Sequence, residues 1–195
     1  MRTVRNLAQI GALTAFLTIA AIAAVPTADA QEVIDATAMG TSTQMGKVIN
    51  IKLLIYSYST PQDKKVLDEA FAKGQNQGLV NALEKMKAVG RIQIPGTIGY
   101  DVSYISSTPS PTGRTIYFVT NRKITFKEAY RNTPSQAYNL SGGEINISDQ
   151  DKSKSAGVLY PAAQLVINKD GDLQIELRQN PWRLTNIIVR GTTKE

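Results

Sequence analysis

VLYPAAQLVINKDGDLQIELR, residues 158–178, carries the strongest fold signal in the chain. Two stretches of alternating apolar residues flank the polar segment Lys169-Asp-Gly-Asp172. An Asp-Gly pair between two such stretches is a strong signal for a tight β-hairpin. The second stretch places three apolar side chains on one face, where we expect them to be buried: Leu173, Ile175 and Leu177. The segment therefore predicts two antiparallel strands joined by a turn.

Alternation with a period of two recurs through most of the chain around this hairpin. Residues 100–106 and 114–120 flank a turn rich in proline and glycine, which predicts a second hairpin. Residues 47–58 give the first long strand and residues 184–190 the last. Helices do not alternate with strands, so a parallel βαβ architecture is not expected. The pattern predicts an antiparallel sheet of about seven or eight strands, in the form of a sandwich or a barrel.

Residues 61–89 differ from the rest because their apolar residues follow a helical period. Thr60-Pro61 combines the hydroxyl cap and the proline that favour a helix start. Gly74 is typical of a helix stop, and a second helix is expected from about Asn76 to Val89. The predicted fold class is therefore α+β, with a helical hairpin after the first long strand. The hairpin is expected to pack over one face or open end of the sheet through Leu67, Phe71, Leu79 and Leu83.

Residues 1–30 have the pattern of a secretory signal peptide. Arg2 and Arg5 precede an apolar run from Ile10 to Val25, and Ala28-Asp29-Ala30 has the small residues that signal peptidases recognise. A transmembrane anchor is the alternative, but a span needs about 20 strongly apolar residues. We expect residues 1–30 to be removed, no stable membrane span to remain, and the protein to be periplasmic or extracellular.

The rest of the chain is expected to contain one domain. Residues 31–46 lack clear periodicity and predict a flexible N-terminal segment, or at most one loosely docked strand. Residues 47–190 are expected to form a single globular domain. The composition, 42% hydrophobic and 19% charged, is typical of a globular protein.

The chain has no cysteine and no histidine, and these absences limit its chemistry. No disulfide can form, and Ser-His-Asp catalysis, Cys-His catalysis and most zinc, copper or iron sites are excluded in their usual forms. A hard cation would need oxygen ligands. The acid pairs Asp149/Asp151 and Asp170/Asp172 are explained by loop and turn chemistry. We therefore assign no metal ligand, no cofactor and no catalytic residue.

The formal net charge of +6 is spread over the sequence. Only Lys64-Lys65 and Arg122-Lys123 are adjacent basic residues. Nucleic-acid binding requires a clustered basic stripe with aromatic residues, so no nucleic-acid partner is expected. A basic exported protein can be attracted to acidic polymers or lipid head groups. The expected partners are therefore an acidic envelope component or a small ligand.

Tyrosines on or beside the predicted strands are the candidate ligand-binding residues. Aromatic rings with a polar tip suit ligand clefts, although tyrosine also suits ordinary sheet faces. We hypothesise a non-enzymatic exported protein that binds a ligand or an envelope partner, in a cleft between sheet and helices. The candidate residues are Tyr56, Tyr58, Tyr100, Tyr104 and Tyr117.

The alternative hypothesis is a carboxylate-dependent hydrolase that acts on glycans. Such an enzyme needs two carboxyl groups roughly 5–10 Å apart. Asp101, Glu128 and Glu144 could supply such a pair, with Asp101 and Glu128 as the named candidates. Two carboxyl groups that face each other in a pocket would favour this hypothesis over the binding protein.

Five segments between residues 58 and 128 form a recognisable set. They are Tyr58-Ser-Thr-Pro61, Leu83-Glu-Lys-Met-Lys-Ala-Val-Gly90, Gly99-Tyr-Asp-Val-Ser-Tyr104, Arg114-Thr-Ile-Tyr-Phe-Val-Thr120 and Ile124-Thr-Phe-Lys-Glu128. Together they resemble an uncharacterised family of small exported bacterial proteins. The resemblance covers most of residues 47–190 and implies export and one compact domain, without an activity or site residues. Relatives often have tryptophan at the position of Tyr58 and an acid at that of Asn121, and the missing acid weakens any catalytic role for Asn121.

Overall fold

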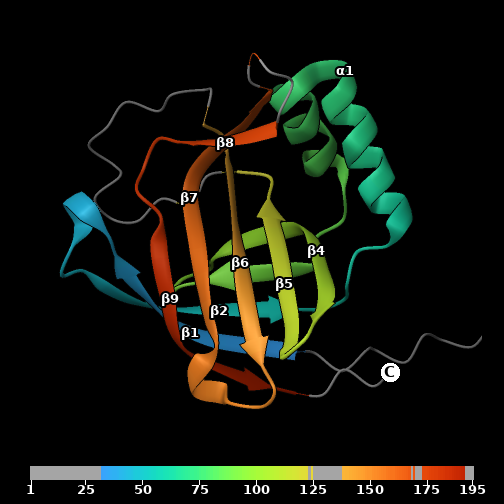
Figure 1. Cartoon of the computed structure of the whole chain (residues 1–195). Coiled ribbons are helices and arrows are strands. Elements are labelled where there is room, and N and C mark those ends of the chain that lie inside the picture. The colour runs from blue at the N-terminus through green and yellow to red at the C-terminus, as the bar shows by residue number, and fades with distance from the viewer. Residues whose placement is uncertain (1–31, 123, 125–137, 168, 170–172, 192–195) are drawn as a thin grey trace, which may run out of the picture.

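The computed structural model describes residues 32–122, 124, 138–167, 169 and 173–191 (Figure 1). Within these residues the chain forms nine strands, one α-helix and two single-turn 3-10 helices. The strands are β1 (Glu32–Gly40), β2 (Val48–Ile55), β3 (Gly90–Gln93), β4 (Tyr100–Ser110), β5 (Gly113–Thr120), β6 (Leu140–Ser148), β7 (Ala156–Ile167), β8 (Leu173–Leu177) and β9 (Trp182–Arg190). The α-helix is α1 (Pro61–Lys85), and the short helices are η1 (Ser42–Gln44) and η3 (Lys152–Lys154).

Eight of these strands form a closed antiparallel barrel. Strands β1 to β6 pair in chain order, β6 also pairs with β7, and β9 joins β7 to β1. Figure 1 shows β5, β6 and β7 in front of β1 and β2, which run across the back. The predicted antiparallel sheet is therefore confirmed, and its form is a barrel. With one helix in the described part of the chain, the fold is mostly β.

The barrel interior is filled by alternate side chains of every barrel strand. The pairing of one layer of residues shows this arrangement. Ile105 pairs with Phe118, and Phe118 pairs with Gly143. Gly143 pairs in turn with Leu159, and Leu159 with Trp182. Directly paired residues point to the same side of a sheet. At Gly143 a Cβ atom would lie 2.5 Å from Cζ of Phe118, so the missing side chain makes room for the phenyl ring.

Strand β8 lies outside the closed barrel, which changes the expected burial of its side chains. The hairpin prediction is confirmed by the antiparallel pairing of β7 with β8, while turn residues 170–172 lie outside the described residues. The prediction that this strand buries Ile175 and Leu177 was wrong. Ile175 is 53% exposed and Leu177 is also exposed, because β8 pairs with the part of β7 that extends beyond the barrel.

The segment predicted to be flexible contains a central strand. Glu32–Gly40 forms β1, which pairs along its length with β2 on one side and β9 on the other. Glu32, Ile34, Ala36 and Ala38 alternate inward and are buried. The prediction of a flexible or loosely docked segment was therefore wrong over these residues, because small alanines that alternate with polar residues can still line a barrel interior.

The predicted helical hairpin is not formed, because Pro61–Lys85 is a single helix, α1. Thr60 and Asp63 form a reciprocal capping box at its start. Gly74 and Gln75 leave helical backbone angles, and the helix resumes directly after them, so they produce a kink rather than a loop. The helix also ends before Val89, whose backbone N–H donates to Val102 and whose carbonyl accepts from Tyr56.

The helix packs against the outer wall of the barrel, beside the end where β8 lies (Figure 1). Buried side chains from both sides of the kink form this contact with Leu140 of β6. They are Leu67, Leu79, Val80 and Leu83, with Phe71 partly buried against them. The predicted packing face is thus confirmed for this single helix. None of the helical segments in the described part of the chain combines the length and apolar character that crossing a bilayer requires.

Candidate functional site

An apolar groove of about 350 Å³ lies between the outer barrel wall, α1 and β8. Outward-facing side chains of β4 to β7 form its floor. The buried helix residues Leu67, Leu79 and Leu83 form one side, and Ile175 of β8 contributes to another. The volume lies within the range of small-molecule sites, which are about 300–1,000 Å³ and mostly apolar.

The hydrogen-bond register places four floor residues side by side across the wall. Tyr104 pairs with Val119, Val119 with Gly142, and Gly142 with Tyr160. Because paired residues share a face, all four positions point outward into the groove. Gly142 contributes no side chain, so the floor is hollow between Val119 and Tyr160.

The neighbouring row adds a ring and a carboxylate. Tyr117 of β5 pairs directly with Glu144 of β6, and both line the groove. Tyr117 is 42% exposed, and Glu144 is partly buried. The Glu144 carboxylate accepts a hydrogen bond of 2.9 Å from the Asn146 amide. The groove therefore presents a carboxylate beside an aromatic ring.

Glu144 also affects the third tyrosine of the groove. Burial raises the pKa of the Tyr160 hydroxyl, and the negative charge of Glu144 raises it further. Tyr160 lies diagonally opposite Glu144 across the β6–β7 pair, since its direct partner is Gly142. The two side chains are thus electrostatic neighbours.

Among the described residues that line the groove, one is a lysine, and it forms an ion pair. On α1, Lys64 Nζ lies 2.6 Å from the Asp68 carboxylate, and both residues border the groove. By contrast, none of the described lysines and arginines forms an ion pair with Glu144. Within the part of the chain that the structure describes, the groove therefore carries an ion pair on the helix and a carboxylate without a basic partner on the barrel.

A buried polar cluster closes one part of the barrel interior. Glu32 of β1, 1% exposed, forms an ion pair with the Arg114 guanidinium of β5. The Tyr58 hydroxyl donates to Glu32 at 2.7 Å and accepts from Arg114 at 3.0 Å. Burial and the hydrogen bond to Glu32 raise the pKa of Tyr58 well above its ordinary range. Each charged group has partners within the cluster, as a structural role requires.

A second hollow, of about 280 Å³, lies where the β4–β5 turn meets η3. Its polar groups largely contact one another. Asp151 accepts a hydrogen bond of 3.0 Å from the Ser153 backbone, and Lys154 Nζ lies 3.7 Å from the same carboxylate. This hollow lacks aromatic residues and is a weaker candidate for ligand binding than the groove.

Two of the five candidate tyrosines lie in the groove. Tyr104 and Tyr117 line its floor, and Tyr58 belongs to the buried polar cluster. Tyr56 is exposed, and Tyr100 packs against the barrel core. Tyr160 also lines the groove, although it was not among the predicted site residues. The alternating sequence around Tyr160 predicts a strand, but the pairing of Tyr160 with Gly142 is what places its ring on the same face as Tyr104 and Tyr117.

The carboxylates proposed for hydrolysis are not seen as a pair. Asp101 of β4 forms a 2.6 Å ion pair with Arg91 of β3, its direct cross-strand neighbour. Glu128 lies outside the described residues, so the pair stays untested. Within the described residues, no three acids gather in a way that could hold a metal ion.

Comparison with known proteins gives no match from which a function could be inferred. The resemblance to a family of small exported bacterial proteins stays a prediction. No protein-family model, no curated protein and no solved structure matches the chain.

Proposed function

We propose that this protein is a non-enzymatic exported protein that binds a small, largely apolar ligand in the groove between α1, β8 and the barrel wall. The observation that carries the proposal is the groove itself. It is concave, about 350 Å³ in volume, and lined mainly by apolar and aromatic side chains. Such a lining with a few polar groups is typical of ligand sites.

The arrangement of the groove supports a preformed site. Its floor belongs to a closed barrel, whose backbone hydrogen bonds hold Tyr104, Tyr117 and Tyr160 in a fixed register. Its helix side is held by buried leucines. A preformed site loses less conformational entropy on binding, which favours affinity.

Two features support binding rather than catalysis. The sequence lacks histidine and cysteine, the side chains most used for proton transfer and nucleophilic attack near neutral pH. Glu144 lies in the groove beside tyrosines, and the second acid that lines it, Asp68, forms an ion pair with Lys64.

The pattern of residues 1–30 supports a site of action outside the cytoplasm.

A fluorescence titration with N-phenylnaphthylamine, a neutral apolar probe, tests this proposal. We expect saturable binding with one probe per protein chain. Val119→Trp enlarges a floor residue and should weaken binding about tenfold or more, because it fills the groove. Ile188→Trp makes the same kind of change on β9, where Ile188 is exposed and is not one of the groove-lining residues.

The control variant should bind the probe as the wild type does. Circular dichroism of both variants establishes that the barrel is intact. Absence of saturable binding to the folded wild type, or an equal loss in both variants, would contradict a ligand site in the groove.

A further inference from the structure

The charge balance of the groove restricts the class of ligand. The Glu144 carboxylate accepts a hydrogen bond from Asn146, and no lysine or arginine in the described part of the chain forms an ion pair with it. A further carboxylate lies nearby on β8, where Glu176 accepts a 2.5 Å hydrogen bond from the groove residue Gln164. Lys64, the one lysine among the described lining residues, is bound to Asp68. As far as the described residues go, the barrel side of the groove is therefore negative.

Two tyrosine rings flank this carboxylate on neighbouring strands. Tyr117 lies directly opposite Glu144, where Cβ atoms are about 4.5–5.5 Å apart. Tyr160 lies at the diagonal position on the other side, at about 7–8 Å, still within reach of an aromatic side chain. Aromatic faces attract cations through their quadrupole, and aromatic cages recognise quaternary ammonium groups in this way.

We propose that the ligand is an amphipathic organic cation whose ammonium head group lies between Glu144, Tyr117 and Tyr160, with its apolar body along the groove toward Leu79 and Leu83. This inference rests on the proposed function, because it assigns a ligand class to the same groove. The rings stabilise the head group by cation–π interaction, and the Glu144 carboxylate compensates its charge. The apolar floor and helix side chains bury the tail.

The same observations argue against other ligand classes. An anion would be repelled by Glu144 and would find the groove lysine already paired. A hard metal ion prefers six or more oxygen ligands, and no group of three acids in the described residues could provide them. A neutral ligand would gain the apolar contacts but would leave the Glu144 charge uncompensated in a largely apolar site.

Three ligands with the same tail test the assignment by isothermal titration calorimetry: octyltrimethylammonium, octanol and octanoate. We expect the cation to bind about tenfold more tightly than the alcohol, equivalent to about 1.4 kcal/mol. We expect octanoate to bind more weakly than either. The shared tail means that differences among the three report on the head group.

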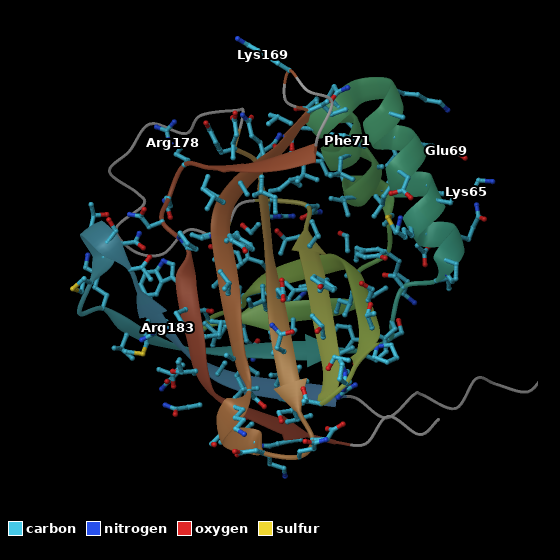
Figure 2. All side chains as sticks on the ribbon, in the orientation of Figure 1. Lys65, Glu69, Phe71, Lys169, Arg178 and Arg183 are labelled. Carbon is cyan, nitrogen blue, oxygen red and sulfur yellow. The ribbon has the colours of Figure 1, made fainter. Side chains whose placement is uncertain are left out.

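Charge removal at the head-group site provides the second arm. Glu144→Gln should reduce affinity for the cation about tenfold and leave affinity for octanol unchanged. Glu69→Gln is the matched control, because it removes one carboxylate from the side of α1 that points away from the barrel in Figure 2. A similar loss in both variants would indicate a non-specific effect of the protein's net charge and would overturn the assignment.

Ring removal provides the third arm. Tyr117→Phe retains the aromatic face and should bind the cation as the wild type does, whereas Tyr117→Leu should weaken it several-fold. If octanol and octyltrimethylammonium bind equally to the wild type, the cation assignment is wrong while the groove remains a ligand site. If none of the three binds, and the neutral fluorescent probe also fails, the proposed function itself is wrong.

Discussion

Removal of Arg114 from the buried polar cluster should destabilise the barrel strongly. In Arg114→Met, the apolar part of the side chain is retained while the buried Glu32 carboxylate loses its ion pair with the guanidinium. Loss of one partner from a buried ion pair costs about 3–5 kcal/mol. Because the Arg114 side chain retains 27% exposure, we expect a loss near the lower limit, about 3 kcal/mol.

Urea unfolding followed by tryptophan fluorescence measures this loss. Trp182 is the single tryptophan and is 2% exposed in the barrel, so its emission reports on barrel opening. With a urea dependence of about 1–3 kcal/mol per molar, the midpoint should fall by about 1–3 M. The double variant Glu32→Leu with Arg114→Leu removes both charges and should recover most of the loss, because no unpaired buried charge remains.

A loss below 1 kcal/mol in Arg114→Met would refute this reasoning. It would mean that solvent reaches Glu32 and that the pair behaves as an exposed one, for which values of about 0–1 kcal/mol are usual. A double variant as unstable as the single variant would likewise show that packing, rather than charge compensation, sets the effect.

Further predictions concern the helix, the alkaline limit and export. Leu83→Ala should reduce the free energy of unfolding in urea by about 2–5 kcal/mol, because this α1 side chain is fully buried against the barrel wall. Val66→Ala, at an exposed position of the same helix, should change stability little, and equal effects would contradict the docking of the helix. Folding raises the pKa of Tyr58, so the unfolded chain loses this proton at a lower pH than the folded protein does. The stability that the neutral Tyr58 hydroxyl contributes is therefore complete below the ordinary tyrosine pKa of about 10 and is lost as the pH rises toward the folded-state pKa. Tyr58→Phe should therefore show a shallower fall in stability above about pH 10 than the wild type, and an identical pH profile would contradict this. After export by the native host, intact mass should correspond to a chain that begins at Gln31, and a mass that retains residues 1–30 would favour the anchor.

The local elements were predictable where the sequence carries its own turn signals. The β7–β8 and β4–β5 hairpins combine alternating apolar residues with glycine-containing turns, and both pairs form. Closure of the barrel was not predictable, because it depends on pairings such as β1 with β9, whose residues are far apart in the sequence. Strand β1 was missed for a related reason, since its alanines become a clear interior face only when both neighbouring strands are present.

For the site as well, local sequence patterns identified some of the residues but not which of them lie together. Alternation identified Tyr104 and Tyr117 as strand residues and therefore as candidates. Their assembly with Glu144 and Tyr160 requires the register of four strands, including the shift beside Gly142. Local sequence patterns do not fix this register, because one residue of slippage keeps each strand's alternation but turns every side chain to the other face.

Strand β7 extends beyond the closed barrel, and the groove is therefore bordered by elements of unequal stability. Its first half belongs to the closed barrel, while its second half holds β8, which pairs with no other strand in the described part of the chain. Amide hydrogens of β8 can thus exchange through local opening that leaves the barrel closed. Ile175 is the residue that β8 contributes to the groove lining, so such opening would change this border of the groove while the rings keep the positions that the barrel gives them.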